Sequence, residues 1–145
     1  MKLYICQVCG HIEFNALPDK CPACGSPKDK FNQNDNIFKD SSAKSPEAEV
    51  KHVPAITVSK KCGLIPEIPC FDIFVRIGKT MHPMEEKHFI QFIDCYQNDM
   101  FISRVQLKPM AVNPAACFHL KNGAGKITIV ENCNIHGYWM SEVTA

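Results

Sequence analysis

Clustered cysteines and histidines are the residues of this chain with the greatest capacity for chemistry. The 145 residues include nine cysteines and six histidines. Thiolates and neutral imidazoles are ligands for transition metals such as zinc and iron. No apolar secretion signal precedes the first cysteine, so we expect a reducing compartment, where clustered cysteines bind metal more often than they form disulfides. The residue types therefore predict metal sites.

The first four cysteines form two pairs with the spacing of metal ligands. Two residues separate Cys6 from Cys9, and two separate Cys21 from Cys24. Two such turns that face each other place four sulfurs around one tetrahedral metal. A glycine follows each pair, and its access to positive φ lets backbone amides face the sulfurs. This spacing predicts a four-cysteine site but does not distinguish iron from zinc.

Five further candidate ligands lie in three short motifs of the second half: His52 in KHVP, His82 and His88 in HPMEEKH, and Cys133 and His136 in CNIHG. Four imidazoles and one thiolate exceed the four ligands that a structural zinc needs. Five ligands leave one position of an octahedron open, as in a reactive iron centre. A thiolate opposite that position pushes electron density toward a bound molecule. Scattered structural histidines remain the alternative at this point.

Short apolar runs must position these ligands. They are rich in β-branched and aromatic residues and are separated by Pro, Gly and Asn, which is typical of strands. The runs are Val53–Ser59, Phe71–Ile77, Phe89–Tyr96, Phe101–Leu107 and Lys126–Glu131, with shorter candidates at Ala116–Leu120 and Tyr138–Val143. About seven short strands in about 100 residues predict a mainly β fold, with a β-sandwich in the second part.

The composition divides the chain into three segments. Residues 1–35 hold the four-cysteine motif, residues 36–47 are polar and turn-rich and are expected to form a linker, and residues 48–145 hold the β domain. The β domain is large enough to fold alone, whereas the N-terminal domain needs a metal to stabilise it.

The charge balance excludes several classes of partner. The net charge is +1, and residues 1–40 contain five lysines and five acidic residues. That balance argues against nucleic acid and anionic membranes as partners, and no apolar run is long enough to span a bilayer. We expect a soluble, cytoplasmic protein.

The N-terminal motif, YICQVCGHIEF followed by CPACGSPKDKF, resembles a rubredoxin-type domain, in particular the short domain that ends rubrerythrins. The likeness covers about residues 3–31. It implies a one-electron Fe(Cys)4 centre, with zinc as the alternative metal and a nucleic-acid-binding zinc ribbon as the alternative domain.

The motifs KHVP, HPMEEKH and CNIHGYW resemble superoxide reductase, the desulfoferrodoxin and neelaredoxin family, from about residue 50 to 142. The resemblance implies an immunoglobulin-like antiparallel β-sandwich that carries a second non-heme iron. It implies that Lys51 is the catalytic cation at the site entrance, although a solvated surface lysine is the alternative. The implied equatorial ligands are His52, His82, His88 and His136, and the implied axial ligand is Cys133.

This family reduces superoxide by one electron to hydrogen peroxide and releases no dioxygen. The implied partners are superoxide and a reduced electron donor such as rubredoxin or its reductase, and the first iron is a candidate relay to the second. Analogy and base rates favour a homodimer. The alternatives are a non-catalytic two-iron electron-transfer protein, a zinc-ribbon module with an inert β domain, and superoxide dismutation.

Two positions depart from the family pattern. Val50 stands where many members have a glutamate that can bind the oxidised iron, and Glu49 faces the other way if this segment is extended. We therefore expect water, hydroxide or no ligand at that position. The last two cysteines of the N-terminal motif, Cys21 and Cys24, are separated by two residues as in rubredoxin, whereas in desulforedoxin the corresponding cysteines are adjacent. Dimer contacts of the desulforedoxin unit therefore cannot be transferred to this chain.

The remaining cysteines and histidines match no ligand position. His11 and His119 are expected to be surface or strand residues. Free, buried thiols are expected at Cys62, Cys70, Cys95 and Cys117. Cys62 and Cys70 could approach each other across a turn, but a structural disulfide is not expected in the cytosol.

Overall fold

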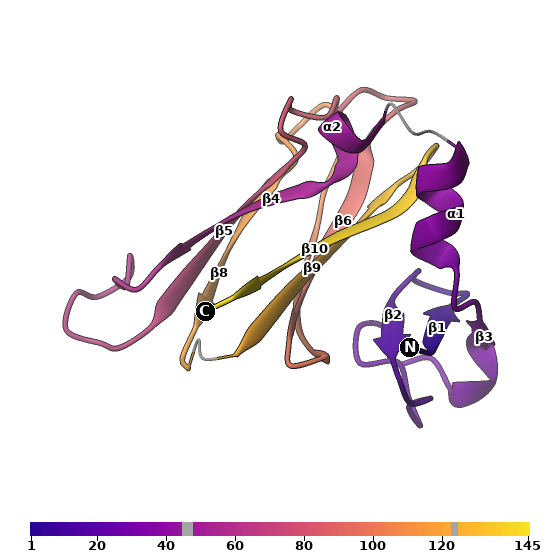
Figure 1. Cartoon of the computed structure of the whole chain (residues 1–145), viewed down its shortest axis with the longest axis horizontal. Helices are drawn as coiled ribbons and strands as arrows, with labels where there is room; N and C mark the ends of the chain where they lie inside the picture. Colours follow the sequence, from indigo (N-terminus) through magenta and orange to yellow (C-terminus); the bar gives the residue numbers. More distant parts are fainter. Residues whose placement is uncertain (45–47, 123–124) are drawn as a thin grey trace.

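A small sheet at the N-terminus lies against one side of a larger β-sandwich (Figure 1). The computed structural model describes residues 1–44, 48–122 and 125–145. None of the helices within these ranges is long and apolar enough to cross a membrane.

The N-terminal sheet has three short antiparallel strands. They are β1 (Leu3–Cys6), β2 (Ile12–Phe14) and β3 (Phe31–Gln33), in the order β2-β1-β3, and a 3-10 turn, η1 (Lys28–Lys30), precedes β3. Cys6 is the last residue of β1 and Cys9 lies in the turn that follows it, while the second cysteine pair lies in the connection from β2 to β3. The sheet thus brings both cysteine turns together.

The second part is a sandwich of two antiparallel sheets. One sheet has the order β4-β5-β8 and consists of β4 (Pro54–Ser59), β5 (Phe71–Ile77) and β8 (Ala115–Leu120). The other has the order β10-β9-β6-β7 and consists of β6 (Ile90–Gln97), β7 (Met100–Gln106), β9 (Lys126–Cys133) and β10 (Gly137–Thr144). Every predicted run overlaps one of these strands, which confirms the mainly β fold.

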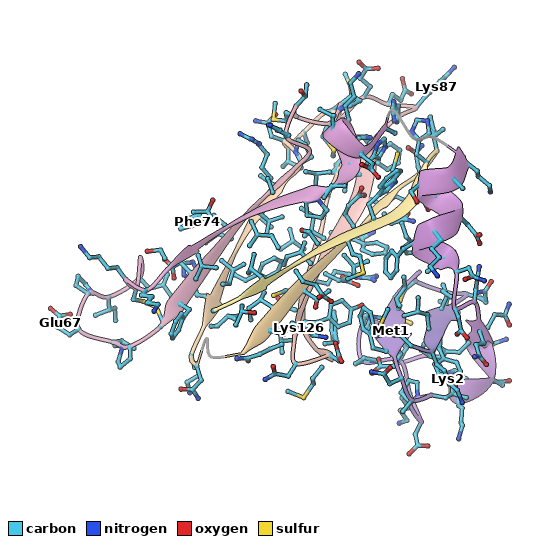
Figure 2. The ribbon with its side chains drawn as sticks, viewed as in Figure 1. Met1, Lys2, Glu67, Phe74, Lys87 and Lys126 are labelled. Atoms are coloured by element: carbon cyan, nitrogen blue, oxygen red, sulfur yellow. A yellow bond between two sulfur atoms is a disulfide. The ribbon has the colours of Figure 1, made fainter. Side chains whose placement is uncertain are left out.

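The alternation along β5 shows why the runs become strands. Ile73, Val75 and Ile77 are buried between the sheets, while Phe74 is 46% exposed on the outer face (Figure 2). Neighbouring residues of a strand point to opposite faces, so one alternating run supplies one side of the core. The core that results holds the ligand-bearing ends of the strands in place.

Two helices interrupt the segment that precedes the sandwich. α1 (Ile37–Lys44) occupies most of the expected linker, whose residues 45–47 lie outside the described residues. α1 contacts β10 through Ser41, a buried residue whose hydroxyl accepts the backbone N–H of Tyr138 at 3.0 Å. α2 (Glu49–His52) is a single helical turn, so the extended backbone considered for Glu49 does not occur.

The N-terminal domain is docked on the outer face of the four-stranded sheet. Leu3, Ile12 and Phe14 from the small sheet share a buried apolar cluster with Tyr96 of β6 and Val130 of β9. A small sheet buries too little apolar surface to be stable by itself. The sandwich therefore supplies the apolar surface that the small sheet lacks.

Polar contacts fix this docking in one register. Arg104 pairs with the carboxylate of Asp94 at 2.6 and 2.8 Å and donates a further hydrogen bond to the carbonyl of Cys9 at 3.0 Å. His11, expected at the surface or in a strand, is fully buried just before β2, with Nδ1 3.5 Å from Asp94. Although burial opposes it, Asp94 and Glu13 raise the pKa of His11.

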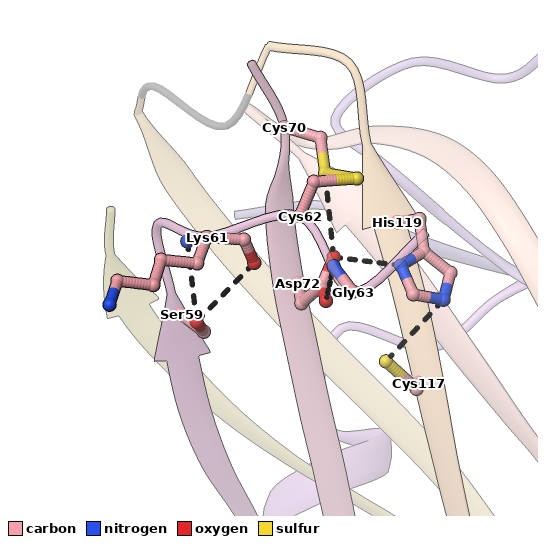
Figure 3. Close-up of a disulfide and its surroundings, with 8 residues drawn as sticks. All are labelled: Ser59, Lys61, Cys62, Gly63, Cys70, Asp72, Cys117 and His119. Atoms are coloured by element: carbon pink, nitrogen blue, oxygen red, sulfur yellow. Dashed lines mark hydrogen bonds and ion pairs between the residues drawn. A yellow bond between two sulfur atoms is a disulfide. The ribbon is translucent and has the colours of Figure 1, made fainter. Parts of the chain in front are cut away.

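The connection between β4 and β5 contains an unexpected disulfide. Cys62 and Cys70 are bonded, with their Cα atoms 5.1 Å apart (Figure 3). Asp72 accepts the N–H of Gly63 at 2.8 Å and lies 2.7 Å from Nδ1 of His119, so it ties the loop to β8. The expectation of two free thiols was therefore wrong, because the return of the chain into β5 brings the two sulfurs together.

Replacing both Cys62 and Cys70 with serine should lower the free energy of unfolding by about 2–3 kcal/mol, since the bond closes a loop of roughly nine residues. Urea denaturation without reductant measures the difference. Cys117→Ser, which removes a free thiol, is the control and should change the free energy far less. Equal stability of the wild-type chain with and without dithiothreitol would contradict the prediction.

Candidate metal centres

The four N-terminal sulfurs converge as their spacing predicted. Sγ of Cys6 lies 3.7 Å from Sγ of Cys24, Sγ of Cys9 lies 3.6 Å from Sγ of Cys21, and all four atoms lie within 4.8 Å of one another. Sulfurs at the corners of a tetrahedron, each about 2.3 Å from a metal, are about 3.8 Å apart. The four cysteines therefore fit a tetrahedral metal.

The two sides of this cluster differ in exposure. Cys6 and Cys21 are buried, Cys9 is half-buried, and Cys24 is exposed. Slight burial of Cys24 tends to raise its pKa, but the hydroxyl and amide of Ser26 outweigh that effect and lower the pKa to about 6. Burial of Cys9, in contrast, raises its pKa. Cys24 therefore marks the solvent side of the cluster.

The four histidines form a square at one end of the sandwich. The ring centroids of His52 and His82 are 4.6 Å apart, those of His82 and His88 4.6 Å, those of His88 and His136 5.0 Å, and those of His136 and His52 4.9 Å. The diagonal from His52 to His88 measures 6.5 Å. These lengths describe four rings arranged around a common centre.

Backbone carbonyls orient two of the rings. Nδ1 of His52 lies 2.8 Å from the carbonyl of Ala48, and Nδ1 of His82 lies 2.7 Å from the carbonyl of Pro83. An Nδ1–H that donates to a carbonyl leaves Nε2 free to bind a metal. The two Nε2 atoms are 3.1 Å apart, close to the roughly 3.0 Å between two nitrogens that bind one metal at a right angle.

Cys133 lies on the axis of the square. Its Sγ is 3.5 Å from Nε2 of His82 and 3.8 Å from Nδ1 of His136, which occupy opposite corners. The tight turn from β9 to β10 returns the N–H of His136 to this sulfur at 3.4 Å, and Gly137 permits the turn with φ +78°. The sulfur therefore sits on one side of the four rings, with a backbone donor to stabilise a thiolate.

Three of the four histidines have lowered pKa values, which favours their uncharged form at neutral pH. Burial lowers the pKa of His52 and of His88, and it lowers the pKa of His82 to about 4. The charges of the neighbouring histidines act in the same direction on all three. Neutral imidazole is the form that binds a metal.

Other side chains close around the square. Trp139 stacks on His52 with ring centroids 4.9 Å apart, and its indole N–H donates to the carbonyl of His136 at 3.1 Å. Lys51 is exposed, but it lies close enough that its charge adds to burial in lowering the pKa of His52 and His88. The residues predicted for the second site are thus brought together, and the lysine lies beside them.

Glu131 is a component that sequence reasoning missed. It is fully buried, two residues before Cys133, and neither of its carboxylate oxygens has a hydrogen-bond partner among the described residues. Burial raises its pKa well above the usual value. Its only signal in the sequence is an acidic residue inside the apolar run KITIVE.

Comparison with protein-family models gives two matches. Residues 44–142 match the model described as desulfoferrodoxin, and residues 4–32 match the rubredoxin-like domain of rubrerythrin. The two matches together cover both metal-site candidates.

Individual relatives give the same result. A desulfoferrodoxin from Syntrophotalea carbinolica is 34% identical over 144 residues, which cover 98% of this chain and 96% of the relative. A superoxide reductase from Pyrococcus horikoshii is 30% identical over 104 residues, 64% of this chain and 85% of the relative. The solved superoxide reductase of Nanoarchaeum equitans is 28% identical with a TM-score of 0.55, covering 66% of this chain and 93% of that one.

Glu131→Gln should raise the free energy of unfolding of the metal-free chain at pH 8 and should have a much smaller effect near pH 4. A carboxyl with a raised pKa holds its proton more tightly in the folded state than in the unfolded state. The free energy of unfolding of the wild-type chain therefore falls as the pH rises above the pKa of Glu131 in the unfolded chain. Glutamine does not titrate, so the variant does not lose stability in this way. Urea denaturation at both pH values measures the difference. Glu67→Gln, an exposed position, is the control, and a pH-independent difference for Glu131→Gln would contradict the prediction.

Proposed function

The chain belongs to the desulfoferrodoxin family, and on that premise we propose that it reduces superoxide to hydrogen peroxide at the five-ligand site. In this reaction superoxide takes up one electron and two protons. The observation that carries the proposal is the square of four histidines with the sulfur of Cys133 on its axis. Among the described histidine, cysteine, aspartate and glutamate residues this group has no sixth member, so in this proposal a small anion takes the remaining position.

The donor set of four imidazoles and one thiolate fits iron, which would be held by His52, His82, His88, His136 and Cys133. Iron bound there supplies the electron and an open coordination position. The chain supplies the rest: carbonyls fix the imidazole tautomers, the amide of His136 supports the Cys133 thiolate, and Trp139 covers His52. The Cys133 thiolate would push electron density through the metal toward a bound molecule.

Lys51 attracts the anionic substrate in this proposal. A fixed cation beside the site raises the local concentration of superoxide and stabilises the charge of the developing peroxide. The proposal keeps the expectation that no protein carboxylate binds the oxidised iron, because Val50 replaces the glutamate of many relatives.

The four-cysteine site is proposed to hold a second iron that relays electrons, and zinc remains the alternative metal. The match to a rubredoxin-like domain supports a one-electron centre, and the sulfur distances fit a tetrahedral metal of either kind. A reduced donor such as rubredoxin or its reductase, a homodimeric assembly and a cytoplasmic location complete the proposal.

A non-catalytic two-iron electron carrier is the second candidate, favoured by the presence of a second redox-type centre in one chain. Such a carrier has no open position, so azide or cyanide would leave the spectrum of its second iron unchanged. Superoxide reduction requires a change.

Fully reduced protein that contains two irons per chain should convert each superoxide to one hydrogen peroxide and release no dioxygen. Pulsed addition of superoxide, followed by peroxide assay and an oxygen electrode, measures both products. Release of dioxygen would indicate dismutation, and an unreactive reduced protein would favour the electron carrier.

Lys51→Ala should lower the second-order rate constant for superoxide by about tenfold at low ionic strength and weaken its dependence on salt. Lys51→Arg should retain most of the rate, because it keeps the charge. Lys87→Ala is the matched control: this exposed lysine precedes His88 (Figure 2) and should matter far less. Equal losses in Lys51→Ala and Lys87→Ala would show a general effect of net charge and no special role for Lys51.

A further inference from the structure

The four-cysteine cluster presents Cys9 to the sandwich and Cys24 to solvent. On the sandwich side, the carbonyl of Cys9 accepts a hydrogen bond from Arg104 at 3.0 Å. The next residue is in still closer contact: a Cβ at Gly10 would lie 2.9 Å from Oη of Tyr138 and 3.2 Å from the ring of Phe92. The backbone that follows Cys9 therefore lies directly on β6 and β10.

Tyr138 joins this backbone to the second site. Its hydroxyl donates to the carbonyl of Gly10 at 2.7 Å, although the two residues are 128 positions apart in the sequence. Burial raises the pKa of Tyr138 to about 12, so the phenol keeps its proton and remains a donor at neutral pH. Only Gly137 lies between Tyr138 and His136 in the sequence, and Gly137 is paired with Cys133 across the β9–β10 hairpin.

We propose that Tyr138 is the positioning residue through which an electron passes from the Cys9 side of the four-cysteine site to the five-ligand site. This inference rests on the proposed function. Electron tunnelling falls off less steeply along covalent and hydrogen bonds than across gaps, and the route Cys9–Gly10–Tyr138–Gly137–His136 has one hydrogen bond and no gap.

The balance of the step is simple. The metal at the four-cysteine site is oxidised by one electron and the metal at the five-ligand site is reduced by one. No covalent bond forms or breaks, and the Tyr138 hydroxyl keeps its proton throughout. Superoxide, which has oxidised the second site beforehand, is the terminal oxidant.

The interface also contains a matched control. Tyr96 donates its hydroxyl to the carbonyl of Ile12 at 2.6 Å, so it makes the same kind of hydrogen bond between the same two domains. Tyr96 pairs with Thr128, which lies five residues before Cys133 on β9. Its partner Ile12 is in β2, after the turn that contains Cys9. Tyr96 therefore contributes to docking but lies off the proposed route.

The experiment compares Tyr138→Phe and Tyr96→Phe with the wild-type protein, each loaded with two irons. Fully reduced protein is mixed with less than one equivalent of superoxide, and absorbance follows each centre. The first phase is oxidation of the five-ligand site. The second is its re-reduction by the four-cysteine site, with a rate independent of protein concentration.

Tyr138→Phe should slow the second phase several-fold and leave the first phase unchanged, while Tyr96→Phe should change neither. Redox titration of both centres and thermal denaturation should agree between the two variants, which would exclude altered driving force or loss of docking as the cause. Equal second-phase rates in the variants, whether slowed together or both unchanged, would overturn the role of Tyr138. Absence of the first phase in the wild type would instead overturn the proposed function.

Discussion

The tight turn between β9 and β10 is the constraint on which the five-ligand group and its contact with the N-terminal domain depend. Gly137, at φ +78°, lets the chain reverse within a few residues, so that the sulfur of Cys133 accepts a hydrogen bond from the backbone N–H of His136. The next two residues then point in opposite directions, as strand geometry requires. Trp139 turns inward and stacks on His52, while Tyr138 turns outward and meets the N-terminal domain. A Cβ at position 137 would also lie 2.6 Å from the hydroxyl of Ser41, so the same glycine lets α1 approach.

Docking of the small domain follows from its size. Three short strands and two cysteine turns enclose only a small core around Phe31, so Leu3, Ile12 and Phe14 are buried against the four-stranded sheet. The Asp94 carboxylate beneath them is fully buried and would be costly without Arg104, which also holds the carbonyl of Cys9. The stability of the domain contact and the position of Cys9 are thus determined by the same ion pair.

Much of this arrangement can be predicted from the sequence, because its signals are local. Alternation within runs such as Phe71–Ile77 gives the strands, and the two-residue spacing of the cysteines gives their convergence. The three histidine and cysteine motifs, through their resemblance to a known family, give the five-ligand group. Features that depend on distant contacts are not visible in this way: α1 is helical where polar residues indicated a linker, and the contact of Tyr138 with Gly10 has no local signature. The burial of His11 depends on domain docking, whereas the approach of Cys62 and Cys70 across a turn was visible in the sequence and their disulfide was excluded only by the expectation of a reducing compartment.

The residues of the five-ligand site are mutually unfavourable without a cation. Burial keeps the imidazoles of His52, His82 and His88 uncharged, and Nε2 of His88 is buried without a partner among the described residues. Glu131 lies two residues from the Cys133 thiol with no donor of its own, and its charge raises the pKa of that thiol after the larger effect of burial. A metal ion bound here would reverse each of these penalties, since it would give the imidazole nitrogens a partner, deprotonate the thiol and offset the nearby carboxylate. The free energy of metal binding at this site would therefore also stabilise the fold, and it would offset the cost of burying polar atoms that lack a partner among the described residues.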